Sequence, residues 1–208
     1  MEKKFLLSDG LFDSSIDELD DLLALLQKPV RDHCRRVAMC SAVIAEYAEK
    51  GFNIFELPVG TSLPIIVHLG GTCHDIGKVF APYPNDYLYH PEIGAKILDK
   101  NKETFFDNEK YVKIVSEIIL HHHEYFDGSG FPKGLYGLDI PSSAWICTIA
   151  NDLDHRMWSE KTFQKNNCHI LKEIKNQAGR KYSEYAVKCL EDSWSDVMVL
   201  YKNWMSGK

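Results

Sequence analysis

Histidines and aspartates recur along this 208-residue chain, and these are residue types that bind transition metals. In chain order, the candidate ligands are His33, His68, His74, Asp75, His90, His121, His122, His123, Asp152 and Asp154. A helical bundle can direct such side chains from several helices at one interior point. Imidazole together with carboxylate favours iron, manganese or zinc over calcium or magnesium. The residue types therefore predict a transition-metal site.

Two adjacent pairs, His74-Asp75 and His122-His123, bear on the number of metals. Neighbouring residues of a regular helix point about 100° apart, so a pair inside a helix does not share one ligand direction. Such a pair suits two metals side by side, or one metal at a helix end. Two pairs in one chain therefore favour a two-metal centre over a single tetrahedral zinc.

Each candidate also has a purely structural interpretation. A single histidine such as His33 is more often a surface or core residue than a ligand, and His90 suits a helix start. The run 121–123 is also compatible with a solvated surface. Lys78, one turn after Asp75, suits a phosphate contact or a lysine at a helix C-terminus, where it interacts with the helix dipole. The joint pattern, rather than any single residue, favours the metal site.

The elements that position these residues are predicted to be helices almost throughout, because apolar residues recur at helical spacing. The predicted helices cover residues 14–27, 29–50, about 62–75, a short stretch from Pro91, 107–123 and 141–157, and two further helices in the C-terminal part, the last carrying Val187, Leu190, Trp194, Met198 and Tyr201. No segment alternates cleanly between apolar and polar residues as a strand does. The sequence therefore predicts an all-α fold in a single domain.

Residues 124–140, "EYFDGSGFPKGLYGLDI", interrupt the helical pattern with four glycines and a proline. Gly128 and Gly130 permit backbone angles that are closed to other residues, and Pro132 stiffens the turn. The segment is predicted to be a loop between two helices.

Composition excludes several classes of protein. A net charge of −6 argues against binding to a nucleic-acid backbone, although bound metal ions still allow a small anionic substrate. No apolar stretch approaches the roughly 18 residues that span a bilayer, and the start of the chain lacks the apolar run of a signal peptide. None of the six cysteines forms a CxxC pair, so they are expected to be reduced and mostly buried. We therefore expect a soluble cytoplasmic protein.

Several motifs together identify a family resemblance. "HDIGK", "HPEIGAKIL" and "HHEYFDGSGFPKGLYGLDIP" resemble the HD-GYP branch of the HD-domain metal-dependent phosphohydrolases, and "HCRRVA" fits the segment that carries the family's first metal histidine. "AGRKYSEYAVKCL" resembles the segment after the catalytic core. The resemblance runs from about residue 29 to 192. It implies an HD-domain helical bundle at residues 29–208, preceded by a helical extension at residues 1–28.

The resemblance implies a bacterial signalling enzyme that hydrolyses cyclic di-GMP to pGpG, and in some members to GMP, through a metal-activated hydroxide. Two divalent ions are expected, iron or manganese first and zinc or nickel as alternatives. By position in the motifs, the implied metal ligands are His33, His74, Asp75, His90, His122, His123 and Asn151. Asp75 is the implied bridge between the ions and, with Lys78, the implied catalytic group. The expected substrate contacts are Lys78, Asp127, Gly128, Gly130 and Lys161, and the 124–140 loop is a candidate site for a protein partner.

The chain departs from the family pattern at several points. Asn151 stands where the family has an aspartate ligand, with Asp154 at the second aspartate of that motif, and an amide brings no negative charge. Pro29 stands where members with a third metal carry a glutamate, so two metals at most are expected. Phe131 replaces the tyrosine that gives the branch its name, and "SEKTFQK" lacks the family's arginines.

These departures leave three hypotheses open. The first is an active cyclic di-GMP phosphodiesterase. The second is an HD phosphohydrolase that acts on another nucleotide or phosphate ester. The third is a catalytically impaired module that binds metal or nucleotide and regulates a partner. The oligomeric state is not predicted by the sequence.

Overall fold

The computed structural model describes residues 19–51, 57, 61–80, 84–102, 109–159 and 167–206. Its helices are α1 (Leu19–Ala24), α2 (Lys28–Gly51), α3 (Leu63–Cys73), α4 (His90–Lys100), α6 (Glu109–His121), α7 (Ser142–Ser159), α8 (Asn167–Lys175), α9 (Glu184–Asp192) and α10 (Trp194–Met205), with 3-10 turns η1 (Ile76–Val79), η2 (Pro84–Tyr89) and η3 (Gly137–Asp139). The described residues contain two isolated bridges and no β-strand. The all-α prediction is confirmed.

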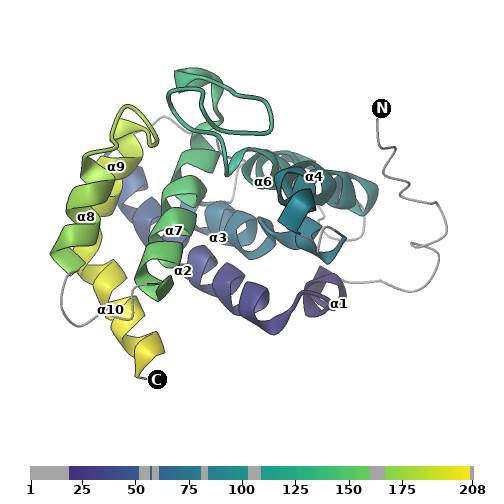
Figure 1. Ribbon diagram of the computed structural model, residues 1–208, viewed down its shortest axis with the longest axis horizontal. Helices are drawn as coiled ribbons and strands as arrows, with labels where there is room; N and C mark the ends of the chain where they lie inside the picture. The colour runs from purple at the N-terminus through teal and green to yellow at the C-terminus, as the bar shows by residue number, and fades with distance from the viewer. Residues whose placement is uncertain are drawn as a thin grey trace.

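Helix α2 is the centre of the bundle. It packs along α3 and α7 and also touches α9 and α10. Figure 1 shows α8, α9 and α10 at one end of the molecule and α4 and α6 toward the other, with α2, α3 and α7 between them. The predicted ligands lie on α2, α4 and α7 and directly after the ends of α3 and α6.

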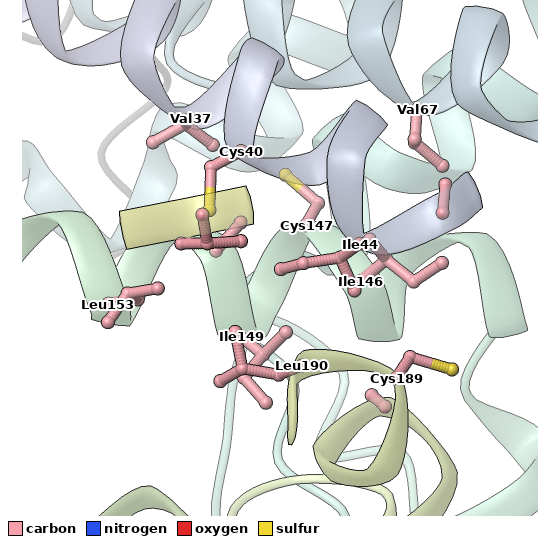
Figure 2. Packing of buried hydrophobic residues seen from close by; sticks show 14 of the residues in the cluster. Val37, Cys40, Ile44, Val67, Ile146, Cys147, Ile149, Leu153, Cys189 and Leu190 are labelled. Atoms are coloured by element: carbon pink, nitrogen blue, oxygen red, sulfur yellow. The ribbon is translucent and has the colours of Figure 1, made fainter. Parts of the chain in front are cut away.

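Two apolar clusters hold these helices together. The larger cluster joins α2, α7 and α9, and Figure 2 shows Ile44, Leu153 and Leu190 among its side chains. The smaller cluster includes Cys73 and Ile76, both fully buried, which flank the His74-Asp75 pair. Burial of the two flanking residues fixes the backbone that carries this pair, because a shift would expose apolar surface to water.

Several sequence-based boundaries agree with the structure. Pro29 lies in the first turn of α2, which begins at Lys28, and Pro91 lies in the first turn of α4. Proline suits this position because its missing N–H has no partner in a helix's first turn. The predicted loop at 124–140 separates α6 from α7 and contains only the short turn η3.

The helices that carry the two ligand pairs are shorter than predicted. Helix α3 ends at Cys73 and α6 ends at His121, so His74-Asp75 and His122-His123 both lie just beyond a helix. Asp75 has φ −102° and ψ 10°, outside regular helical geometry. The 100° separation of neighbouring helical residues therefore does not apply, and both members of a pair can face the same point.

The prediction of two helices after α7 was wrong. The described residues after α7 form three, because the expected last helix is divided at Ser193 into α9 and α10. The Ser193 hydroxyl donates a hydrogen bond to the carbonyl oxygen of Leu190 at 3.2 Å. Serine hydroxyls that bond nearby carbonyls compete with the helical ladder, and apolar spacing continues through the break without showing it.

Other expectations are tested only in part. Of the predicted helix at 14–27, α1 lies in the described range, and residues 14–18 lie outside it. A division between an extension and a domain at residue 28 stays a prediction. The cysteines are free, and all are buried except Cys168. Within the described ranges, no helix combines the length and apolar character that crossing a membrane requires.

Candidate metal centre

Six of the predicted ligands converge in two groups of three. One group consists of His33 from α2 with His74 and Asp75; the other consists of His90 from α4 with His122 and His123. Within each group, the nitrogen or oxygen atoms that could bind a metal all lie within 4.8 Å of one another. We call these the first and the second cluster. Their residues are 0–7% exposed, so the ligands are already withdrawn from water.

Asp75 joins the two clusters through its two carboxylate oxygens. Its Oδ2 lies 3.4 Å from Nε2 of His74 and 3.9 Å from Nε2 of His33. Its Oδ1 lies 3.1 Å from Nε2 of His90 and 3.9 Å from Nε2 of His122. One carboxylate therefore faces both clusters, which is the arrangement that a bridging ligand requires.

Backbone carbonyls fix the orientation of three imidazoles. Nδ1 of His74 donates to the carbonyl oxygen of Gly71 at 2.8 Å, and Nδ1 of His122 donates to that of Ile119 at 2.8 Å. Nδ1 of His90 donates in the same way to the carbonyl of Tyr87. A carbonyl oxygen only accepts, so in the neutral ring the proton sits on Nδ1 and the lone pair sits on Nε2. This is how metal-binding histidines are commonly oriented.

The donor atoms fit a bound cation. Nε2 of His90 and Nε2 of His122 lie 3.2 Å apart, although each carries a lone pair and neither has a proton to share. His74 Nε2 and Asp75 Oδ1 are buried without a hydrogen-bond partner. Buried polar atoms without partners are costly. A metal ion between these atoms would satisfy all of them.

Electrostatics keep the histidines in the ligand form. Burial lowers the pKa of His74, and burial together with the charge of His123 holds the pKa of His122 well below its usual range. Burial and His90 lower the pKa of His123 to about 2. Burial acts to raise the pKa of Asp75, but the contacts with His74, His90 and Lys78 hold it well below its usual range. The rings of His74, His122 and His123 are therefore neutral beside the Asp75 carboxylate.

Asn151 and Asp154 of α7 occupy two sides of His33. Oδ1 of Asn151 lies 3.0 Å from Nε2 of His33, on the side that faces the first cluster. Asp154 accepts a hydrogen bond from Nδ1 of His33 at 2.7 Å and two from Arg36 at 2.8 and 2.9 Å. Asn151 thus lies beside the first cluster, and Asp154 orients the ring of His33.

Asp152, an early ligand candidate, lies away from both clusters. It accepts hydrogen bonds from Arg156 at 2.7 Å, from Lys181 at 2.9 Å and from the hydroxyl of Tyr182. Asp152 therefore points in a different direction from its neighbour Asn151, as adjacent residues of a helix do. Asp152 connects α7 to the turn before α9.

Lys78 reaches the centre from η1. Its Nζ lies 2.5 Å from Oδ2 of Asp75, and its side chain is 20% exposed. Gly77, the preceding residue, allows η1 to approach α4 closely, since a Cβ at this position would lie 2.0 Å from the carbonyl oxygen of His90. Glycine at position 77 therefore brings Asp75 and Lys78 against the ligand His90.

The 124–140 loop is held beside the second cluster by a residue that the sequence analysis missed. Glu124, 2% exposed, accepts backbone hydrogen bonds from Lys133 at 2.7 Å and Leu135 at 3.0 Å. Gly130 passes so close to the helix end that a Cβ would lie 2.4 Å from the carbonyl oxygen of His123. The ring of Phe131 stacks on that of His123 at 4.6 Å. Glu124 follows His123 directly in the sequence, and this adjacency to a predicted ligand was the signal that could have identified it.

Asp127 and Gly128, predicted to contact substrate, form a turn of this loop. Asp127 is exposed, and its carboxylate accepts hydrogen bonds from the backbone and hydroxyl of Ser129 at 3.0 and 2.6 Å. Gly128 has a positive φ of 77° and shapes the same turn. The structure thus gives Asp127 a role in the turn, and a substrate contact there stays a prediction. Lys161 lies outside the described residues.

Two further residues border the clusters and were not predicted. The hydroxyl of Tyr87, in η2, lies 3.2 Å from Nε2 of His123. His155, one turn after Asn151 on α7, stacks on His33 with ring centroids 4.5 Å apart. His68 is exposed, and His121 lies 3.7 Å from Glu124, so both stay outside the clusters as expected.

Comparison with known proteins agrees with this site. The HD domain family matches residues 30–156. The chain is 30% identical over 184 residues to a cyclic di-GMP phosphodiesterase of Thermotoga maritima, covering 79% of this chain and 45% of that protein. It is 26% identical over 185 residues to a 3'3'-cGAMP-specific phosphodiesterase of Vibrio cholerae, covering 81% and 32%. The chain therefore spans less than half the length of these relatives.

Solved structures show the same fold. The HD domain of L. monocytogenes phosphodiesterase PgpH, solved with cyclic-di-AMP, superposes with a TM-score of 0.58 at 18% identity, covering 90% of this chain and 98% of that one. A cyclic GMP-AMP specific phosphodiesterase of V. cholerae gives 0.59 at 17% identity, covering 84% and 47%. With its two histidine clusters joined by Asp75, the chain belongs to the HD domain family and to its HD-GYP branch.

Proposed function

We propose that the chain is a metal-dependent phosphodiesterase that hydrolyses a cyclic dinucleotide, with cyclic di-GMP as the substrate and pGpG or GMP as the product. The observation that carries this proposal is the pair of clusters that share the Asp75 carboxylate. Two metals held side by side are the established means of stabilising both the attacking and the leaving oxygen of a phosphoryl group.

The substrate class is supported by the relatives. Three of them are named as phosphodiesterases of cyclic di-GMP or of 3'3'-cGAMP, and a solved HD domain of the same fold holds cyclic-di-AMP. Each of these compounds is a ring closed by two phosphodiesters. Because the chain spans less than half of the curated relatives, we carry the substrate over only as a proposal.

The chain's own residues have separable roles in this reaction. The Nε2 atoms of His33 and His74, with Oδ1 of Asn151, would hold one divalent ion, and His90, His122 and His123 would hold the other, with Asp75 facing both. Iron or manganese suits these donors, with zinc or nickel as alternatives. When bound, the ions supply an activated water and neutralise charge on phosphate oxygens. Asp154 and the carbonyls of Gly71, Tyr87 and Ile119 hold the rings in position.

Lys78 is proposed to contact the substrate phosphate. In the structure its ammonium neutralises Oδ2 of Asp75. Once Oδ2 of Asp75 binds a metal, the lysine no longer serves as its counter-charge. Lys78 is then free to bind a phosphate oxygen beside the metals, as a point charge. Two further proposals rest on the family resemblance alone. One is that substrate contacts Asp127, Gly128, Gly130 and Lys161, and the other is that a protein partner binds the 124–140 loop.

A second candidate is a regulatory module that binds metal and nucleotide without turnover. It is favoured by Asn151, which leaves Asp75 as the single carboxylate among the seven predicted metal ligands. Fewer anionic ligands weaken the hold on divalent ions. An HD phosphohydrolase acting on another phosphate ester uses the same site and differs only in substrate.

One experiment separates these candidates. Protein loaded with Fe(II) or Mn(II) is incubated with cyclic di-GMP and with a panel of nucleotides and phosphate esters, and products are separated by chromatography. We expect release of pGpG, abolished in His74→Ala and strongly reduced in Lys78→Met, which keeps every predicted metal ligand. Binding without release points to the regulatory module. Turnover of another ester but not of cyclic di-GMP would show that the substrate is that ester. Failure to bind any metal would exclude a metal-dependent enzyme.

A further inference from the structure

Tyr87 contacts the second cluster although it lies outside the predicted ligand set. Its hydroxyl oxygen is 3.2 Å from Nε2 of His123. Its ring centroid lies 5.1 Å from that of His90 and 5.5 Å from that of His123. The phenol therefore enters the cluster from η2, a segment that contributes no predicted ligand.

The main chain of Tyr87 is fixed to the same cluster. Its carbonyl oxygen accepts the hydrogen bond from Nδ1 of His90, and His90 begins α4 three residues later. The backbone that orients one ligand thus also carries the phenol toward another. Tyr87 is 40% exposed, and both its carbonyl oxygen and its hydroxyl contact histidines of the second cluster.

The separations match those of neighbouring ligands on one metal. Bonds of about 2.0–2.2 Å from a metal to nitrogen or oxygen place adjacent donors about 2.8–3.6 Å apart across octahedral and tetrahedral geometry. The Tyr87 hydroxyl and His123 Nε2 are 3.2 Å apart, His90 Nε2 and His122 Nε2 are 3.2 Å apart, and His90 Nε2 and Asp75 Oδ1 are 3.1 Å apart. The phenolic oxygen is spaced like the other donors.

Charge gives an independent reason for a further anionic ligand. The two clusters share one carboxylate, from Asp75, because position 151 is an amide. Two divalent ions bring four positive charges into a site whose predicted ligands are otherwise neutral. A tyrosine that binds as phenolate adds a second negative charge at the centre. The proton on its oxygen leaves to solvent when the metal binds, as at other metal ligands.

We infer that the phenolic oxygen of Tyr87 is a ligand of the metal in the second cluster, beside His90, His122, His123 and Asp75. Tyrosine is a known oxygen ligand of iron, and an anionic oxygen suits its oxidised form. The inference rests on the metal binding that the proposed function requires, and it does not depend on the substrate.

Absorption spectroscopy of the iron-loaded protein tests this ligand. After oxidation to iron(III), a phenolate ligand produces a broad charge-transfer band in the visible region, which histidine and carboxylate ligands do not. We expect the band in the wild-type protein and its loss in Tyr87→Phe, with iron content measured in each sample. Tyr89→Phe is the matched control, since Tyr89 is also in η2 and is 49% exposed, and it should keep the band.

The outcomes are decisive in both directions. A band that persists in Tyr87→Phe at equal iron content, or an iron-loaded wild type without a band, overturns the inference. Loss of iron from Tyr87→Phe with an unchanged circular dichroism spectrum supports it. Hydrolysis of cyclic di-GMP is assayed separately on the same samples. A band without hydrolysis contradicts the proposed function and supports Tyr87 as a ligand. Hydrolysis without a band supports the proposed function and contradicts Tyr87 as a ligand.

Discussion

The carboxylate of Asp154 accepts a hydrogen bond from Nδ1 of His33 at 2.7 Å and thereby turns Nε2 of that ring toward the first cluster. The same carboxylate is 1% exposed, and it also pairs with the Arg36 guanidinium and accepts a bond from the Tyr201 hydroxyl at 3.1 Å. One buried acid therefore couples a metal ligand on α2 to α7 and α10. It links the stability of the bundle to the geometry of the site.

Asp154→Asn should weaken both functions. The amide cannot accept from His33 and both Arg36 nitrogens at once, and it leaves a buried guanidinium without a counter-charge. Breaking such a buried pair costs about 3–5 kcal/mol of stability, and loss of the group that orients a ligand lowers metal affinity by about 10–100-fold. Urea unfolding and a Mn(II) titration measure the two effects. Unchanged values in both would show that Asp154 is not coupled to the cluster.

Asn151→Asp should have the opposite effect on the metal. It places a carboxylate 3.0 Å from Nε2 of His33, where the amide oxygen now lies. An added anionic ligand is expected to tighten binding at the first cluster on the order of tenfold, measured by calorimetric titration with Mn(II). Asp152→Asn is the control, since Asp152 contacts Arg156 and Lys181 and should change stability without changing the titration. Equal affinity in wild type and Asn151→Asp would place position 151 outside the ligand set.

Glu124→Gln should loosen the 124–140 loop. The two carboxylate oxygens accept the N–H groups of Lys133 and Leu135, and glutamine keeps only one acceptor oxygen. A buried N–H group left without a partner costs about 1–3 kcal/mol. Urea unfolding should show this loss, and limited proteolysis should cut the loop faster. Asp139→Asn, exposed in the same loop, should behave like wild type; a similar loss there would assign the effect to loop charge.

Part of the two clusters could be predicted because adjacent residues carry their own signal in the sequence, whereas His33 and His90 were assigned through the family resemblance. His74-Asp75 and His122-His123 are adjacent pairs, and the helical spacing around them placed α3 and α6 nearly correctly. The helix ends were not visible, because apolar spacing continues up to each pair. Ending α3 at Cys73 is what lets His74 and Asp75 face one cluster together.

The neighbours of the ligands could not be predicted from their types. Tyr87, Glu124 and His155 reach the clusters through contacts between segments that only the folded chain brings together. A tyrosine in a short 3-10 turn or a histidine one turn after Asn151 has no pattern that distinguishes it from a surface residue. Likewise, Ser193 divides α9 from α10 by a hydrogen bond that local apolar spacing does not encode.

The metal-free protein should lose stability as pH falls below neutral. Burial lowers the pKa of His74 and His122 in the folded state, and that of His123 to about 2. In the unfolded chain these rings bind protons as pH falls through about 6.5. The unfolded state then carries more protons than the folded state, so the free energy of unfolding decreases with decreasing pH, by up to about 1.4 kcal/mol per pH unit for each histidine. The pKa of Asp75 is also lowered in the folded state, so its contribution to stability is lost only below the usual pKa of an aspartate. The change in the free energy of unfolding between pH 6.5 and 4 is therefore due to the histidines.

Urea unfolding of the metal-free protein at pH 7.5, 6.5 and 5.5 measures this dependence. His123→Gln removes one of the buried rings and should flatten the curve, because one fewer proton is taken up on unfolding. His169→Gln, whose side chain is 56% exposed on α8, should leave the curve unchanged. Stability that stays constant from pH 7.5 to 5.5 in the wild type would mean that the imidazoles already share protons when the metal is absent. In that case the close approach of His90 Nε2 to His122 Nε2 would be a hydrogen bond, and it would no longer indicate a site that needs a cation.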